Sequence, residues 1–162
     1  PLGLSTGAAD IFGVTGGVTE AVIRRLAENK STTELRAIAF NGVRGMEGTK
    51  ETVVPYGDRE LKIAIVSGLK NAENLIRRMQ SGEASYDFVE VMACPGGCVC
   101  GAGQPITDAQ GKTKRGSGLY AADKMCSIKR SEENPVVMSL YSDLLKGRVH
   151  ELLHVEYNER NR

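Results

Sequence analysis

The stretch from residue 61 to residue 92 constrains the fold most, because a strand pattern, a helix pattern and a second strand pattern follow each other without interruption. The segment "LKIAIV" (61–66) is apolar and rich in β-branched residues, which is typical of a buried strand. Apolar residues recur with helical spacing in "LKNAENLIRRMQS" (69–81), and Gly82 fits the end of that helix. "YDFVEVM" (86–92) is a second strand. This order predicts a βαβ crossover with two parallel strands, and therefore an α/β fold.

The segments before this unit add one helix and two short strands. "GGVTEAVIRRLAENK" (16–30) predicts a surface helix with one buried face that begins at a Gly-Gly pair. "LRAIAF" (35–40) and "ETVVPY" (51–56) are short strand patterns joined by a glycine-rich loop, and their pairing is left open.

The segments after residue 106 predict a loop and then helices. "TDAQGKTKRGSG" (107–118) is polar, basic and glycine-containing, so we expect a loop. "LYAADKMCSIKR" (119–130) is a helix pattern, Pro135 begins another that ends at Gly147, and "RVHELLHVEY" (148–157) is the last. Together these patterns predict one α/β domain without a linker.

Composition limits the class of protein and its partners. With 162 residues, of which 41% are hydrophobic and 25% charged, the chain suffices for one globular domain with a core. The balance of 21 basic and 20 acidic residues favours neither nucleic acid nor a membrane surface as a partner. No apolar run is long enough to span a bilayer and "PLGLSTGAAD" (1–10) does not resemble a secretory signal, so we expect a cytoplasmic protein with reduced thiols. Because the sequence begins at Pro1, we expect a piece of a longer chain.

A cysteine cluster follows the second strand of the βαβ unit directly. "VMACPGGCVCGAGQP" (91–105) places three cysteines within seven positions and surrounds them with glycines. Ligand sites in open α/β sheets lie beyond the carboxyl ends of the strands, and Cys94 is two residues past such an end. A metal or iron–sulfur site, a redox pair and buried filler all remain open. The glycines favour a bulky ligand that the backbone must approach closely.

These residues resemble a specific family, the iron-only (FeFe) hydrogenases. "FVEVMACPGGCVCGAGQP" (88–105) is similar to the third signature motif of that family, although Ala102 stands where the family prefers glycine. The resemblance extends over essentially the whole chain and includes 1–24, 61–76, 131–145 and 150–157. It implies an α/β fold in which this chain is one lobe of the iron hydrogenase large-subunit fold, with βαβ units and a partly parallel sheet flanked by helices.

The resemblance also implies an active-site H-cluster, in which a 4Fe-4S cubane held by four cysteines is bridged to a two-iron unit that carries CO, cyanide and a dithiolate. By position, Cys94 and Cys98 would be two of the four ligands, and Cys98 would be the bridging, catalytic thiolate. Met92 and Phe12 would line the pocket of the two-iron unit. The parent enzyme would catalyse the reversible oxidation of molecular hydrogen to protons and electrons.

Two further motifs of the family, which carry the other two ligands and a proton-transferring cysteine, are absent from these 162 residues. Residues 1–162 would therefore be the C-terminal part of the catalytic domain, and the isolated chain would be inactive with no complete cluster. Expected partners are the remaining half of that domain and an electron carrier such as ferredoxin or a nicotinamide-linked subunit, with self-association of the isolated chain. Cys100 and Cys126 are candidate substitute ligands.

Three alternative interpretations compete with this one. A hydrogenase-like iron–sulfur assembly factor without the two-iron unit resembles the same motif, often with a serine where this chain has Gly96, so Gly96 favours the enzyme. "HELLH" (150–154) satisfies the zinc-peptidase pattern, but only Glu156 and Glu159 follow as third ligands. "FGVTGG" (12–17) before a helix could cradle a phosphate, yet close packing near the cluster explains its glycines better.

Overall fold

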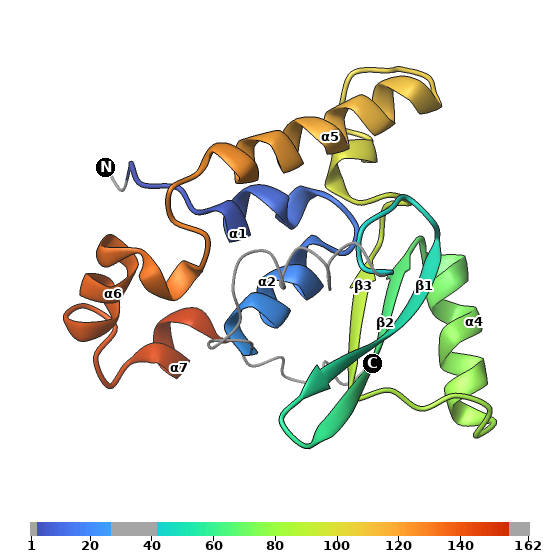
Figure 1. The fold of residues 1–162 in the computed structure, drawn as a ribbon, viewed down its shortest axis with the longest axis horizontal. Coiled ribbons are helices and arrows are strands. Elements are labelled where there is room, and N and C mark those ends of the chain that lie inside the picture. Colours follow the sequence, from blue (N-terminus) through green and yellow to red (C-terminus); the bar gives the residue numbers. More distant parts are fainter. Residues whose placement is uncertain (1–2, 27–41, 156–162) are drawn as a thin grey trace, which may run out of the picture.

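The computed structural model describes residues 3–26 and 42–155 (Figure 1). The predicted strand at 35–40 and the end of the first predicted helix (27–30) lie outside these residues. The elements are α1 (Gly7–Asp10), the 3-10 turn η1 (Ile11–Gly13), α2 (Gly17–Leu26), β1 (Thr49–Tyr56), β2 (Arg59–Ser67), α4 (Leu69–Gln80), β3 (Phe88–Met92), η2 (Cys98–Cys100), α5 (Ala109–Met125), η3 (Ser131–Glu133), α6 (Pro135–Ser142) and α7 (Val149–Leu153).

The described strands form one three-stranded sheet in the order β1-β2-β3. β2 and β3 are parallel and are connected through α4, with Ile63 opposite Phe88 and Ser67 opposite Met92. β1 pairs antiparallel with β2 through a tight turn in which Gly57 has a φ of 60°. The predicted βαβ unit and the α/β class are therefore confirmed, and the strand predicted at 51–56 pairs with the first strand of that unit.

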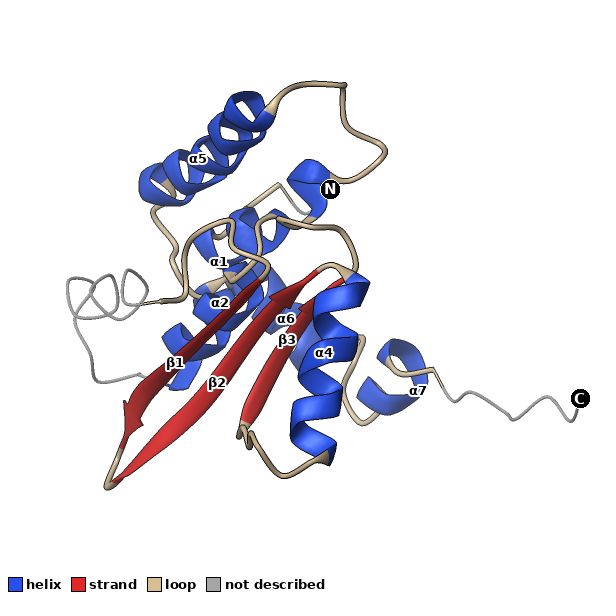
Figure 2. Ribbon diagram, turned by 90° about the vertical axis from the view of Figure 1, so that its right-hand side faces the viewer, coloured by secondary structure: helices blue, strands red, loops and turns tan. Residues whose placement is uncertain are grey.

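The central strand β2 is apolar and buried from Ile63 to Val66, where helices cover both of its faces (Figure 2). Ile63 and Ile65 lie in one core cluster with Ile23 of α2. Ala64 and Val66 lie in a second cluster with Leu75 of α4. Adjacent residues of a strand point to opposite faces, so a strand buried on both sides needs a continuous apolar run, which residues 63–66 provide.

The loop predicted at 107–118 is wrong, because this segment forms the first half of the long helix α5. The Asp108 carboxylate accepts the Gly111 N–H at 2.8 Å and caps the new helix. Gly116 is buried against Val14, where a side chain would begin to touch the Val14 methyl groups. Of the glycines that suggested a loop, Gly111 is the one whose lack of a side chain is required, because a Cβ there would collide with the Thr107 side chain.

The C-terminal segment contains shorter helices than the sequence predicts. Asn134 caps α6 by accepting the N–H groups of Val136 and Val137, and Pro135 occupies the first turn as predicted. The helix ends at Ser142 rather than continuing to Gly147, and α7 covers only part of the last predicted helix. No helix between residues 3 and 26 or 42 and 155 is long and apolar enough to cross a membrane.

Candidate metal centre

The cysteine cluster forms a loop that begins where the two parallel strands end. The Gly68 N–H donates to the Met92 carbonyl at 2.8 Å, which joins the carboxyl ends of β2 and β3. The Gly96 N–H donates to the Ser67 hydroxyl at 3.0 Å. The loop is thus held to both strand ends, at the edge of the sheet where α/β proteins place their ligands.

The backbone of this loop forms a tight turn followed by the short 3-10 helix η2. The Gly97 N–H donates to the Cys94 carbonyl at 2.9 Å, and the Gly101 N–H donates to the Cys98 carbonyl at 3.0 Å. Gly96 and Gly97 have φ angles of 86° and 97°, a region that glycine adopts without strain. The two glycines are therefore required for the turn that separates Cys94 from Cys98.

The turn also packs closely on the segment between η1 and α2. The Thr15 N–H donates to the Gly96 carbonyl at 3.2 Å. A Cβ atom on Gly97 would lie 2.7 Å from both the Gly13 carbonyl oxygen and the Thr15 nitrogen. Close packing on this segment therefore explains Gly97, whereas the glycines at 13, 16 and 17 are packed closely on Leu119, Val43 and Ile11.

Glu90 occupies the position at which a phosphate would bind to the N-terminus of α2. Its carboxylate accepts the N–H groups of Gly16 at 2.6 Å and Thr19 at 2.7 Å, and it also accepts the Thr19 hydroxyl at 2.7 Å. The chain thus supplies its own anion to the positive end of the helix. Sequence reasoning missed this role, although a carboxylate within the strand pattern "FVEVM" is a signal for a buried polar partner.

The candidate ligands differ in exposure. Cys98 is exposed, whereas Cys94 and Cys100 are partly buried, and all of them are free thiols. A buried filler role is therefore wrong for Cys98. The Cys94 sulfur lies 3.4 Å from the Cβ position of Gly101, and the Cys100 sulfur lies 2.9 Å from that of Gly96, so side chains there would crowd the sulfur atoms.

Two thiols on a bare turn fit part of the coordination shell of an iron–sulfur cluster, for which cysteine thiolates are the usual ligands. The described part of the chain contains no group of three or more His, Cys, Asp or Glu side chains that could hold a metal ion. The residues present therefore fit half of a four-cysteine site.

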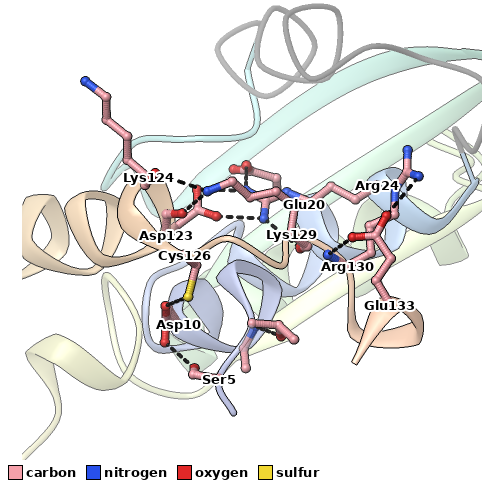
Figure 3. Close-up of polar contacts among 12 residues, drawn as sticks. Ser5, Asp10, Glu20, Arg24, Asp123, Lys124, Cys126, Lys129, Arg130 and Glu133 are labelled. Carbon is pink, nitrogen blue, oxygen red and sulfur yellow. Dashed lines mark hydrogen bonds and ion pairs between the residues drawn. The ribbon is translucent and has the colours of Figure 1, made fainter. Parts of the chain in front are cut away.

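Cys126 lies in another environment, at the end of α5 (Figure 3). Its thiol donates to the Asp10 carboxylate at 3.2 Å, and the Ser5 hydroxyl donates to the same side chain at 2.9 Å. The hydrogen bond to Asp10 raises the pKa of the Cys126 thiol, which disfavours the thiolate needed for iron binding. The structure gives no support to Cys126 as a substitute ligand.

Met92 and Phe12 lie on the two elements that meet at the loop. Met92 is the last residue of β3 and is half-buried. Phe12 belongs to η1, directly before Gly13, whose carbonyl oxygen contacts Gly97, and its side chain is 46% exposed. Met92 therefore precedes the turn closely in the chain, whereas Phe12 is adjacent to a residue that contacts it, and neither side chain is fully buried.

The zinc-peptidase motif forms part of the short helix α7. The Nδ1 atoms of His150 and His154 lie 2.7 Å apart. Glu151, the residue that would act as the base, forms an ion pair with Arg148 at 2.8 Å. Its two candidate third ligands, Glu156 and Glu159, lie outside the described residues. The geometry therefore gives no support to a peptidase.

Two family models match the chain. The model described as the C-terminal domain of the iron only hydrogenase large subunit matches residues 1–102. The model described as the iron hydrogenase small subunit matches residues 109–160. The boundary between the two matches falls between the cysteine loop and α5.

Individual relatives agree with these models. The chain is 45% identical to the NADP-reducing hydrogenase subunit HndD of Solidesulfovibrio fructosivorans, covering 100% of this chain and 28% of the relative. It is also 31% identical to the cytosolic iron-sulfur assembly component 3 of Rattus norvegicus, covering 90% of this chain and 32% of the relative. A solved FeFe-hydrogenase of Chlamydomonas reinhardtii superposes with a TM-score of 0.63 at 35% identity, over 90% of this chain and 45% of that one.

The chain thus spans less than a third of these curated relatives. By sequence and by fold, the chain belongs to the iron-only hydrogenase family.

Proposed function

We propose that residues 1–162 are the C-terminal part of the catalytic domain of an iron-only hydrogenase and supply two of the four cysteine ligands of its H-cluster. The parent enzyme catalyses the reversible oxidation of molecular hydrogen to protons and electrons. The observation that carries this proposal is the glycine turn between Cys94 and Cys98, which Ser67 and Thr15 hold at the ends of the two parallel strands.

Cys94 and Cys98 hold iron as thiolates in this proposal. The exposed Cys98 would hold the cubane and the two-iron unit together, and the partly buried Cys94 would hold the cubane alone. Backbone N–H groups close to coordinated sulfur stabilise its negative charge and tune the redox potential. When bound, the cluster supplies the electron transfer and the chemistry of hydrogen.

Met92 and Phe12 line the pocket of the two-iron unit and exclude water from it. Phe12 is exposed and Met92 is half-buried, and in this proposal the remaining half of the domain covers the apolar surface of both. A water-excluded site strengthens every electrostatic interaction inside it.

The principal partner in this proposal is the remaining half of the catalytic domain, which carries the other two ligands. Electrons pass to a carrier such as ferredoxin or a nicotinamide-linked subunit, and the name of the NADP-reducing relative is consistent with the second. We place the protein in the cytoplasm, where thiols stay reduced.

Anaerobic reconstitution tests the proposal when it is performed on the 162-residue chain and on a polypeptide that also contains the missing half. We expect the infrared bands of CO and cyanide, together with the iron content of a full cluster, only from the longer polypeptide. A half-site loses most of its affinity, so the short chain should hold no complete cluster. Bands of CO and cyanide from the short chain, or none from the longer one, contradict the proposal.

The second candidate is an iron–sulfur assembly factor that lacks the two-iron unit. The relative named as an assembly component supports it, since it covers 90% of the chain. The same experiment separates the two functions: an assembly factor gives a cubane signal in electron paramagnetic resonance without CO and cyanide bands. Assembly factors often carry a serine at the position of Gly96, so Gly96→Ser tests whether this residue separates the two functions. A Cβ at Gly96 would lie 2.8 Å from the Met46 methyl group, so this substitution also requires Met46 to move.

A further inference from the structure

The peptide group between Thr15 and Gly16 is held by two buried charged side chains. Its oxygen, the Thr15 carbonyl, accepts a hydrogen bond from the Lys50 ammonium at 3.2 Å. Its N–H, which belongs to Gly16, donates to the Glu90 carboxylate at 2.6 Å. Lys50 and Glu90 are 9% and 5% exposed, so both charges are largely withdrawn from water.

The sheet places these two side chains on the same face and in the same row. Lys50 of β1 is opposite Ile65 of β2, and Ile65 is opposite Glu90 of β3. Residues that are paired across neighbouring strands point to the same face, and Ile65 packs in the core cluster that contains Ile23 of α2. Lys50 and Glu90 therefore flank Ile65 beneath the beginning of α2.

Each charge is fully engaged by hydrogen bonds. The Lys50 ammonium has three N–H donors and bonds the carbonyl oxygens of Thr15, Val43 at 2.7 Å and Gly45 at 2.8 Å. Burial lowers the pKa of Lys50, and the negative charge of Glu90 acts in the opposite direction. Buried charges are costly unless they are paired and hydrogen-bonded, so each of the two requires the contacts that it makes.

The held peptide is directly connected to the cysteine turn. The N–H of Thr15 donates to the Gly96 carbonyl, and the backbone of Gly97 lies against Gly13 and Thr15 so closely that no Cβ fits between them. A displacement of the Thr15–Gly16 peptide therefore displaces the surface on which the turn between Cys94 and Cys98 rests.

We propose that Lys50 and Glu90 are positioning residues, which together fix the Thr15–Gly16 peptide and thereby hold Cys94 and Cys98 in the geometry that iron binding needs. Only the last step, from the position of the turn to iron binding, rests on the proposed function. The clamp itself, meaning Lys50, Glu90 and the peptide between them, is a property of the chain without metal.

The test compares Lys50→Met, Glu90→Gln and the double variant with Lys62→Met and Glu60→Gln, which change exposed residues of β2. Amide hydrogen exchange of the 162-residue chain reports on the clamp. We expect the exchange of the Thr15 and Gly16 amides to accelerate about tenfold or more in either clamp variant, the effect of losing a hydrogen bond to a charged group. Protection in α4, on the opposite face of the sheet, should stay unchanged.

The accessibility of the thiols reports on the turn. We expect faster alkylation of the partly buried Cys94 in both clamp variants, while Cys126, which bonds Asp10, serves as the internal reference. Lys50→Arg keeps the charge and should restore part of the protection at Thr15. If the single variants do not fold, amide exchange and alkylation of the double variant test the clamp instead. The double variant has neither charge, so it contains no unpaired buried ion at this site.

Iron binding is then measured on the polypeptide that contains the missing half. We expect the clamp variants to retain less iron after chelator challenge and to shift the redox potential of the cubane, with no shift for Lys62→Met. Exchange and alkylation at wild-type rates in all clamp variants would overturn the inference, whether or not iron binds. If exchange is faster in the clamp variants but the wild-type polypeptide never binds iron, the clamp is supported and the proposed function is refuted.

Discussion

Arg24 and Asp123 form a buried two-point ion pair: Arg24 Nη1 and Nη2 donate to Asp123 Oδ1 and Oδ2 at 2.8 and 2.9 Å (Figure 3). The pair connects α2, in the segment that matches the large-subunit model, to α5, in the segment that matches the small-subunit model. Glu20 accepts hydrogen bonds from both Arg24 and Arg44, at 2.6 and 2.7 Å. These charges join the two parts of the chain across its interior.

The first prediction concerns this ion pair. The Arg24 side chain is 8% exposed and forms ion pairs with Asp123 and Glu20. In Asp123→Ala, Glu20 is the acidic partner that remains of these two. Breaking a buried pair from one side costs about 3–5 kcal/mol, and the contact with Glu20 places the expected loss near the lower end of that range. Urea unfolding measures it. The control is Glu73→Ala in the exposed pair with Arg77, which should cost about 0–1 kcal/mol.

The second prediction is that the free energy of unfolding depends on pH in the acid range through Asp123. Burial acts to raise the pKa of Asp123, but the hydrogen bonds and charge of Arg24 outweigh it, so the pKa lies below its usual value. The carboxylate is then stabilised in the folded state. This contribution is complete above the unfolded pKa of about 3.9 and is lost as the pH falls through the lower folded pKa.

Asp123→Asn should therefore flatten the loss of stability on acidification. The measurement is the free energy of unfolding of the wild type and the variant from about pH 6 down to about pH 2. Equal slopes for the two proteins in the acid range would contradict the direction given for the pKa of Asp123.

The local patterns of the sequence predict the βαβ unit well, because β2, α4 and β3 follow each other directly and each has its own periodicity. The second half of α5 lies in the helix predicted at 119–130, but its first half could not be predicted in the same way. Its buried residues include a glycine and the charged Asp123, so it shows no apolar stripe of the kind that marks a surface helix. Its position is set by distant partners such as Arg24 and Val14.

The same limit applies to the candidate site. The motif predicts Cys94 and Cys98 as ligands, but the clamp formed by Lys50 and Glu90 depends on strand pairing that no local pattern reveals. A lysine and a glutamate in strand patterns suggest solvent exposure, since these residues are rarely buried unless they are paired. Their shared row across Ile65 emerges only once the antiparallel and the parallel register are both known.

The third prediction concerns the glycine of the turn. Gly97 has φ 97° and ψ −173°, a conformation that is essentially restricted to glycine, and a Cβ would collide with Gly13 and Thr15. Gly97→Ala should lower the free energy of unfolding by about 1–3 kcal/mol from backbone strain alone, with further loss from the collision. Thermal and urea unfolding measure it. Gly103→Ala, in open space two residues beyond Gly101, should stay within about 0.5 kcal/mol of the wild type.

The fourth prediction concerns apolar surface near the cysteine loop. Phe12, Val91 and Ile106 are 46%, 55% and 104% exposed, and large exposed patches on a lone domain promote association. We expect the isolated chain to self-associate, and we expect Phe12→Ser combined with Ile106→Ser to weaken that association. Light scattering over a concentration series measures it. Ile76→Ser on α4, which is 53% exposed, is the matched control. A monomeric wild type at high concentration would contradict this prediction.

The last prediction separates the cysteines in the polypeptide that contains this chain and the missing half. If Cys98 bridges the cubane and the two-iron unit, Cys98→Ser should prevent stable attachment of the two-iron unit and abolish hydrogen turnover. Cys94→Ser removes a corner ligand, and a serine oxygen can hold iron in part, so it should retain some cluster with a changed redox potential.

Cys100→Ser and Cys126→Ser are the controls for this series and should leave hydrogen turnover nearly intact. The Cys126 thiol is hydrogen-bonded to Asp10, and Cys100 is at a variable position of the motif. Iron content and hydrogen evolution of all four variants are measured side by side. If Cys100→Ser is as inactive as Cys98→Ser, the ligand set must be reassigned among the three clustered thiols, because the tight backbone turn would then present Cys100 to the iron in place of a neighbour.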